Sequence, residues 1–230
     1  IQLPVPSLFT FNMPGNNITT LMGVSVPEAA IKIIGTKIMQ QGPLLITHWG
    51  MSGPAVLKTS AVAARELAAR GYAFTILVNW LPGTTDEDLR EIWEQLRKEQ
   101  GRQAVANKNP FGLPKRLWEF MVQECGINGE VRWGDLPAAA RNKLTERLLR
   151  DAYNVKGKTT FKEEFVTCGG INISEIDPQT LQSRLMPGMY FAGEILDVDG
   201  ITGGYNFQHA WSSAWIAAQH IAKQSLVPQA

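Results

Sequence analysis

The sequence predicts an α+β fold in which two β-rich regions flank a helical segment and a last strand leads through a glycine-rich turn into a helix. Runs of Ile, Val and Thr broken by turn residues fill Leu8–Thr47 and return after Tyr153. Between Thr84 and Asp151 the apolar residues recur at helical spacing instead. The stretch Phe191–Trp211 carries four glycines before an apolar helical pattern. With 230 residues and 44% apolar side chains, the chain can fill such cores.

The first β-rich region predicts a meander or part of a β-barrel, because short runs such as SLFTF and PLLIT alternate with turn residues. A helix is expected next, with Ser52 as its N-cap, Pro54 in its first turn and Gly71 just past its end. The apolar run Tyr72–Trp80 then predicts a strand.

The middle of the chain predicts three amphipathic helices. Thr84 with Glu87 three residues later resembles a capping box at the start of the first helix. The apolar residues that follow it have helical spacing: Leu89, Ile92, Trp93 and Leu96. The second helix is expected over Pro114–Cys125 and the third from Asp135 to about Arg150. Together they predict a small helical subdomain.

Strands are expected again over Lys158–Ile173 and in the short run GMYFAG, Gly188–Gly193. The last helix is expected over Asn206–Lys223. One apolar face of that helix is expected to consist of Phe207, Ala210, Trp211, Ala214, Ala218 and Ile221.

Charge and cysteine content exclude several classes of protein. The 22 Lys and Arg residues nearly balance 21 Asp and Glu, so we expect neither a nucleic-acid partner nor a membrane surface on electrostatic grounds. Cys125 and Cys168 are too few for a disulfide framework and lack metal-ligand spacing, so we expect no metal site and a reducing, cytoplasmic setting. No apolar run approaches the roughly 18 residues of a membrane span. Since the first residue is Ile1, the chain is expected to begin inside a longer protein.

The glycine-rich turn predicts a ligand site. A strand ending at Gly193 and a helix opened by Gly203 and Gly204 would point unpaired backbone N–H groups and a partial positive charge at a ligand. Glycines there permit close approach to the main chain, and Glu194 could accept hydrogen bonds from hydroxyl groups. The alternative is a flexible turn with acids that face solvent.

Three separated stretches carry a resemblance to a known family. LLITHWGMSGPAVLKTS, FVTCGGINISEIDPQTLQSRLMPGMYFAGE and YFAGEILDVDGITGGYNFQHA resemble the BaiN-like (YhiN-like, aminoacetone-oxidase-like) NAD(P)/FAD-dependent oxidoreductases. The resemblance implies a Rossmann-like FAD domain with two inserted parts. On this pattern residues 1–83 and 152–186 form a β-barrel-like insert, residues 84–151 a helical subdomain, and residues 187–230 the C-terminal piece of the FAD domain.

The resemblance also implies a cofactor and its contacts. Glu194 would bind the ribityl hydroxyls of FAD beside Gly193, and the start of the last helix would face the pyrimidine end of the flavin ring. The residues implied there are Gly203, Gly204, Tyr205 and Asn206. Gly169 and Gly170 of the TCGG stretch would bring backbone close to the ring, unless they form a β-bulge instead. The expected reaction is flavin redox chemistry on a small-molecule substrate, with NAD(P)H or O2 as the redox partner, and the oligomeric state is left open.

One departure from the family limits these expectations. The chain has no G-x-G-x-x-G turn, which in such enzymes cradles the pyrophosphate of FAD. We therefore expect the C-terminal portion of such an enzyme, inactive by itself and binding FAD weakly or not at all.

Two other classes of function compete with the flavoprotein hypothesis. A hydrolase could use Ser52 as nucleophile and His48 as base, but G-x-S-x-G requires a glycine where the chain has Pro54. In a flavoprotein His48 would be a proton donor or a substrate contact, or else a buried structural histidine. A non-enzymatic binding module on a flavoprotein scaffold is the third hypothesis, and a yellow full-length protein would exclude it.

Overall fold

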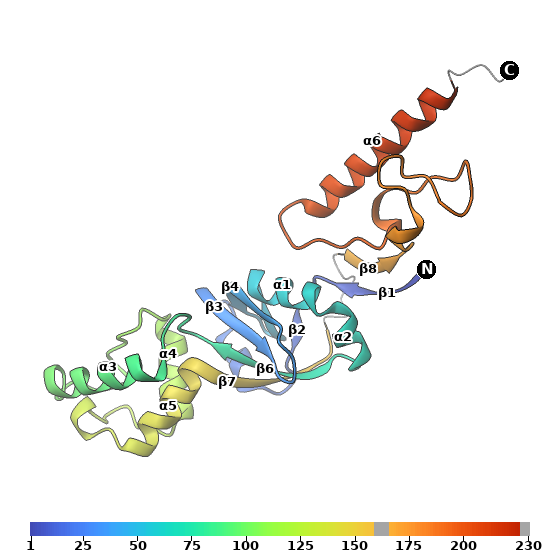
Figure 1. Ribbon diagram of the computed structural model, residues 1–230. Coiled ribbons are helices and arrows are strands. Elements are labelled where there is room, and N and C mark those ends of the chain that lie inside the picture. The colour runs from blue at the N-terminus through green and yellow to red at the C-terminus, as the bar shows by residue number, and fades with distance from the viewer. Residues whose placement is uncertain (159–165, 226–230) are drawn as a thin grey trace. The chain divides into compact units, whose positions relative to one another are not determined.

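The computed structural model describes residues 1–158 and 166–225 and has the mixed α+β composition that the sequence predicts (Figure 1). The described residues divide into two compact units. The barrel unit comprises residues 10–59 and 72–158, and the glycine-turn unit comprises residues 1–9, 60–71 and 166–225.

The barrel unit contains a six-stranded antiparallel sheet that nearly closes into a barrel. Its strand order is β2-β5-β4-β3-β6-β7. The two edges meet where Phe11 bridges Lys158 and the Asn12 N–H donates to the Gly157 carbonyl at 3.2 Å. The strands are β2 (Phe11–Asn12), β3 (Ser25–Ile33), β4 (Met39–Ile46), β5 (Gly50–Ser52), β6 (Ala73–Asn79) and β7 (Asp151–Lys156). The barrel expected from the first β-rich region is therefore confirmed.

Alternation along the strands fills the barrel core. Every second residue of β6 is buried, at Phe74, Ile76 and Val78, because successive side chains of a strand point to opposite faces. Phe74 packs edge-to-face on Phe11, with ring centroids 5.1 Å apart. A short helix, η1 (Asn17–Leu21), is capped by the Asn16 side chain.

The helix expected in one piece between residues 52 and 71 is two helices. They are α1 (Pro54–Val62) and α2 (Ala64–Ala69). At Ala63 the backbone has φ −102° and ψ 8°, and this ψ leaves the helical range. Neither glycine nor proline marks this break, so the sequence contains no signal for it.

Three helices of the barrel unit form the expected helical subdomain. They are α3 (Asp86–Glu99), α4 (Lys115–Glu124) and α5 (Ala138–Arg150), with η2 (Trp133–Asp135) before α5. Trp93 stacks on Trp133 with centroids 5.6 Å apart, and Trp118 donates from its indole N–H to the Val105 carbonyl at 2.9 Å. The third helix starts later than expected because Asp135 ends η2 and the next two residues are extended.

The glycine-turn unit is organised around a strand pair and one long helix. β1 (Gln2–Ser7) pairs antiparallel with β8 (Val166–Gly170). The other elements are η3 (Ile173–Glu175), η4 (Gly193–Ile195) and α6 (Tyr205–Ser225). Residues 159–165 of the expected strand lie outside the described residues. The run Gly188–Gly193 is not a strand: Tyr190 makes only an isolated bridge with Gln182, and the chain then enters η4.

α6 packs on its own unit through a different face from the one that the sequence predicts. Its buried residues include Ser213 and Ala217, and Ala217 belongs to a cluster with Ile176, Leu181 and Leu196. The expected apolar face is largely exposed, with Phe207 and Trp211 each about two-thirds accessible. Among the described residues, no helix has the length and apolarity required to cross a bilayer.

Candidate functional site

The start of α6 is the most open part of the predicted ligand site. The first turn of a helix leaves N–H groups without intrahelical acceptors, and the first helical bond here runs from the Gln208 N–H to the Gly204 carbonyl at 2.9 Å. Gly203 and Gly204 are exposed and have φ values of +121° and +85°. A Cβ atom on Gly204 would meet no atom within 4 Å, whereas one on Gly203 would lie 3.2 Å from the Tyr205 ring. The turn therefore has open space beside Gly204.

Asn206 positions the turn with its side chain. Its Oδ1 accepts from the Gly200 N–H at 2.7 Å, and its Nδ2 donates to the Gly200 carbonyl at 3.0 Å. Both groups of the amide are thus used to close the loop between residues 200 and 206. Any contact of Asn206 with a ligand would come from its backbone N–H.

Residues 192–194, the AGE stretch, are hydrogen-bonded to the middle of α6. The Gly193 N–H donates to Ser213 Oγ at 2.9 Å, and Ser213 Oγ in turn donates to the His209 carbonyl at 2.7 Å. Glu194 Oε1 accepts from the Thr167 N–H at 3.0 Å, while the residue stays exposed. Ser213 lies eight residues after the first residue of α6, which is roughly 12 Å along a helix axis. A ligand that reaches both places must be elongated.

Gly169 and Gly170 have a reason to be glycine that involves no ligand. A Cβ on Gly169 would lie 2.6 Å from the Leu3 carbonyl oxygen, and one on Gly170 would overlap the Ile195 carbonyl oxygen. The β1–β8 register is irregular between Gln2 and Val5, opposite this pair. Close packing of the chain on itself therefore explains both glycines, and their contact with a cofactor stays a prediction.

Two acids near the turn, Asp197 and Asp199, tie the loop to other parts of the same unit. Arg65 pairs with Asp197 at 2.6 Å, and Ser7 Oγ donates to Asp199 Oδ2 at 2.8 Å. Cys168 lies close by in β8 and is buried. Burial raises the pKa of its thiol to about 11, with the Asp199 charge adding to the rise, so Cys168 is protonated at neutral pH.

His48 and Ser52 belong to the β4–β5 hairpin and form no catalytic pair. His48 is exposed at the hairpin turn and meets the Trp49 ring edge-to-face at 4.4 Å, so the buried-histidine alternative is wrong. Ser52 pairs with Leu45 along the strands. In the described part of the chain no hydrogen bond joins His48 to Ser52, and the hydrolase hypothesis gains no geometric support.

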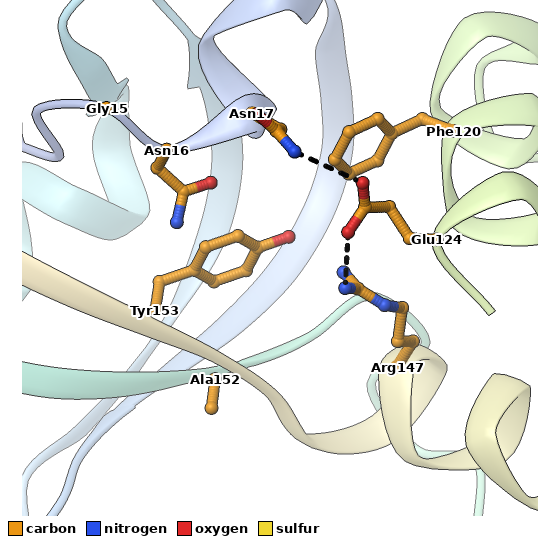
Figure 2. Close-up of a pocket in the computed structure, with 8 residues that line it drawn as sticks. All are labelled: Gly15, Asn16, Asn17, Phe120, Glu124, Arg147, Ala152 and Tyr153. Atoms are coloured by element: carbon orange, nitrogen blue, oxygen red, sulfur yellow. Dashed lines mark hydrogen bonds and ion pairs between the residues drawn. The ribbon is translucent and has the colours of Figure 1, made fainter. Parts of the chain in front are cut away.

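A polar cavity of about 240 Å³ lies in the barrel unit where the η1 loop meets the helical subdomain (Figure 2). Its charged wall is the ion pair between Arg147 and Glu124, 3.0 Å long, and Asn17 donates to Glu124 at 3.4 Å. Sequence reasoning missed this cavity, because its residues come from η1, α4, α5 and β7, and only the fold brings them together.

Buried Asp151 lies beside this cavity, and its carboxylate interacts with other groups of the protein. Its carboxylate accepts from Trp80 Nε1 and from the Tyr153 hydroxyl, and Arg147 lies 3.2 Å from it. Burial raises the pKa of Asp151, while the Tyr153 hydrogen bond and the Arg147 charge oppose that rise. Because every polar group here has an internal partner, the cluster serves to join α5 to β7.

The described residues contain no group of three or more His, Cys, Asp or Glu side chains placed to hold a metal ion. Cys125 is buried, and burial raises the pKa of its thiol to about 11. The remaining chemistry of the site therefore lies in the glycine turn, the exposed Glu194 carboxylate and the start of α6.

The described residues form a nearly closed barrel with a three-helix insertion, followed by a glycine turn and a long helix. This combination matches the class of protein that the sequence motifs indicate. The family model described as "HI0933-like protein barrel and H2TH domain" matches residues 5–166. The chain belongs to this HI0933-like family, and the resemblance found in the sequence is thereby confirmed.

Three curated relatives align with nearly the whole chain. A ribosomal RNA dihydrouridine synthase of Escherichia coli is 35% identical over 93% of this chain and 50% of its own length. One of Haemophilus influenzae is 31% identical over 94% of this chain and 51% of its own. A 3-dehydro-bile acid delta(4,6)-reductase of Clostridium scindens is 26% identical over 96% of this chain and 54% of its own. The chain thus spans about half the length of the curated relatives it matches.

Proposed function

We propose that the chain is part of an FAD-dependent oxidoreductase that adds two hydrogens across a carbon–carbon double bond. The observation that carries the proposal is the open N-terminus of α6 beside Gly204, on the same helix that holds Gly193 and exposed Glu194 through Ser213.

The residues of the glycine-turn unit fit the flavin half of FAD. Backbone N–H groups of Tyr205 and Asn206 would hold the pyrimidine end of the ring, where the partial positive charge of the helix stabilises added negative charge. Glu194 would accept from the ribityl hydroxyls with the oxygen that Thr167 does not occupy. The separation of the two contacts along α6 suits an elongated ligand. When bound, FAD supplies the two-electron chemistry, and the protein positions and tunes it.

The names of the relatives support a reductive reaction. Dihydrouridine differs from uridine by two hydrogens across one ring double bond, and a delta(4,6)-reductase is named for the double bonds on which it acts. We propose the same overall change here: a nicotinamide loses a hydride, the substrate carbons gain that hydride and a proton, and the double bond becomes single. O2 would be an alternative acceptor of the electrons.

Two substrate classes follow from these names. A uridine base within ribosomal RNA is favoured by two relatives at 35% and 31% identity. A small unsaturated ketone accords with the third relative and with the small-molecule substrate expected from the sequence. The balanced charge of the chain argues only against a general electrostatic affinity for RNA.

Flavin retention in the full-length protein tests the cofactor. We expect Glu194→Ala to lose FAD on dialysis and Gly204→Val to alter the flavin spectrum, because a side chain would enter the space beside the turn. Glu130→Ala, at an exposed carboxylate of the barrel unit, is the matched control and should retain FAD. A colourless full-length protein after reconstitution with FAD would refute the proposal.

Reoxidation of the anaerobically reduced full-length enzyme tests the substrate. Uridine-containing ribosomal RNA and a conjugated steroid ketone are added separately, and recovery of oxidised flavin is followed together with the mass of the product. Recovery with either, accompanied by a gain of two hydrogens, supports double-bond reduction. If neither restores the oxidised spectrum while O2 does, the reductase proposal fails.

A further inference from the structure

Three arginines of the helical subdomain have no bonding partner among the described residues. They are Arg97, Arg102 and Arg132, and all three are exposed. Every other arginine of the chain forms an ion pair or donates to a backbone carbonyl group, at positions 65, 70, 90, 116, 141, 147, 150 and 184. A guanidinium group has five N–H donors, so these three side chains are available to an acceptor outside the chain.

The fold brings the three arginines together at one end of α3. Arg97 lies in the last turn of that helix, Arg102 in the turn that follows it, and Arg132 directly before η2. The Trp133 N–H donates to the Gln103 carbonyl at 3.0 Å. Hydrogen-bonded segments lie roughly 5 Å apart, so one ligand can contact both Arg102 and Arg132. We call Arg97, Arg102 and Arg132 the arginine cluster.

The backbone that carries the arginine cluster is closely packed. A Cβ atom on Gly134 would lie 3.0 Å from the Gly101 carbonyl oxygen, and one on Gly101 would lie 2.7 Å from the Arg97 carbonyl oxygen. Next to them Trp133 is 3% exposed and stacks on Trp93 of α3. A fixed backbone lowers the entropy that a ligand loses on binding to the side chains it carries.

Nearby acids do not neutralise the arginine cluster. The acids in residues 95–109 and 127–135 are Glu99, Glu130 and Asp135, against the three arginines, Lys98 and Lys108. Within the described part of the chain, none of these acids forms an ion pair. The surface at this end of α3 therefore has an excess of positive charge.

The helix dipole explains only part of the arginine cluster. Cations in the last turn of a helix are stabilised by the partial negative charge at its end, which accounts for Arg97 and Lys98. Arg102 and Arg132 lie beyond the last turn and come from two separate segments. Their side chains make no hydrogen bond to a helix carbonyl in the described residues, so the dipole does not account for them.

We infer that the arginine cluster binds the phosphodiester backbone of an RNA substrate. The inference rests on uridine within ribosomal RNA as the substrate class of the proposed function. The planar guanidinium group of arginine matches two oxygens of one phosphate, and linked phosphates can occupy several arginines at once. A small unsaturated ketone carries no such groups. The balanced charge of the whole chain is compatible with this site, because the contacts depend on local charge.

Salt-dependent binding of RNA to the full-length protein tests the inference. Protein-free ribosomal RNA is titrated into the protein without a nicotinamide, so that no turnover occurs. We expect Arg102→Gln with Arg132→Gln to weaken binding and to reduce the dependence of log K on log salt by about 2, since each phosphate contact contributes about 1. Lys32→Gln with Lys37→Gln removes two exposed cations of the same unit and should change neither. Equal affinity and salt dependence in the arginine variant and the unmodified protein overturn the inference.

A conservative pair separates phosphate recognition from charge and folding. Arg102→Lys with Arg132→Lys keeps both charges but loses the planar fork, so the salt dependence should stay and the affinity should fall. All variants should keep their urea midpoint, because the replaced side chains are exposed. Phosphatidylserine vesicles and inorganic phosphate are tested as other sources of phosphate. Binding to either that equals binding to RNA overturns the assignment to an RNA backbone.

Kinetics distinguish this inference from the proposed function. With ribosomal RNA as substrate, the variant Arg102→Gln with Arg132→Gln should have a raised KM and an unchanged kcat, because contacts to the RNA backbone stabilise the ground state and the transition state equally. A yellow enzyme whose KM for ribosomal RNA is unchanged in this variant refutes the arginine cluster alone. A colourless protein that binds RNA through the cluster refutes the proposed cofactor alone.

Discussion

At the scale of single residues, Asp151 shows how the fold joins the helical subdomain to the barrel. Asp151 is 5% exposed, directly follows the last residue of α5 and is the first residue of β7. Trp80, Tyr153 and Arg147 all reach it. A buried carboxylate is tolerated only when its charge and lone pairs have partners, so these three residues hold one geometry at the joint.

Removal of the Asp151 carboxylate should destabilise the protein strongly. We expect Asp151→Ala to lower the free energy of unfolding by about 3 kcal/mol, because it leaves the buried donors of Trp80 and Tyr153 without their acceptor and removes one of the two acidic partners of Arg147. Asp151→Asn should cost less, since an amide oxygen still accepts from Trp80. Glu124→Ala removes the other partner of Arg147 in a more exposed position and should cost about 1 kcal/mol or less. Urea unfolding measures all three, and equal losses for Asp151→Ala and Glu124→Ala would contradict this assignment.

The glycines show what the sequence can and cannot predict about single residues. The need for glycine at Gly169, Gly170 and Gly204 is visible in the sequence. The sequence does not show which atoms approach each position, because β1 and η4 reach Gly169 and Gly170 from distant parts of the chain. The sequence therefore predicted a ligand at all three, and the structure leaves open space only beside Gly204.

At the scale of elements, the start of α3 shows how a helix signal can be displaced by one residue. Thr84 and Thr85 both have an acid three residues later, so the sequence offers two capping boxes. The structure uses Thr85: its hydroxyl accepts from the Asp88 N–H at 3.2 Å, and Asp88 Oδ2 accepts from the Thr85 N–H at 2.7 Å. The expected N-cap at Thr84 is wrong, because Thr85 has the extended backbone that a cap requires.

Matched variants distinguish the two caps. Thr85→Ala should lower the free energy of unfolding by about 1 kcal/mol, and Thr84→Ala should change it little. The Thr85 hydroxyl and backbone N–H hold the pKa of Asp88 below its ordinary value. The stabilisation by Asp88 is therefore present above its ordinary pKa and is lost as the pH falls through the lowered value. Urea unfolding at neutral and acidic pH measures both effects. A larger loss of stability for Thr84→Ala than for Thr85→Ala would instead support Thr84 as the N-cap of α3.

α6 shows the same limit for a whole element. Its helical pattern and the membership of its apolar face follow from residue spacing in the sequence. Periodicity does not tell which apolar residues face the chain's own core. Ala217 packs on Leu196 and Ile176, and Ser213 accepts from the Gly193 N–H. The positions of these partners depend on loops without a periodic signal.

At the scale of the whole molecule, the sequence predicted the individual structural elements better than the contacts between them. The barrel, the helical subdomain and the terminal helix are confirmed, and alternation or helical spacing explains each. The pairing of β1 with β8 and the cavity between η1 and α5 join segments more than 100 residues apart, as between Ser7 and Val166. No local pattern encodes such contacts. The domain boundaries expected at residues 83, 151 and 186 stay predictions.

The unequal burial of the two units predicts how the chain unfolds. The barrel unit encloses its apolar side chains, whereas the glycine-turn unit leaves Trp211, Trp215 and much of β1 in water. Since stability scales with apolar area removed from water, the glycine-turn unit of the isolated chain should open at a lower urea concentration. Hydrogen exchange followed by mass spectrometry should show slow amides in β3, β4 and β6 and faster ones in β1, β8 and α6. A single cooperative transition in the isolated chain, with equal protection of α6 and β3, would mean that the small core around Ala217 suffices to stabilise this unit.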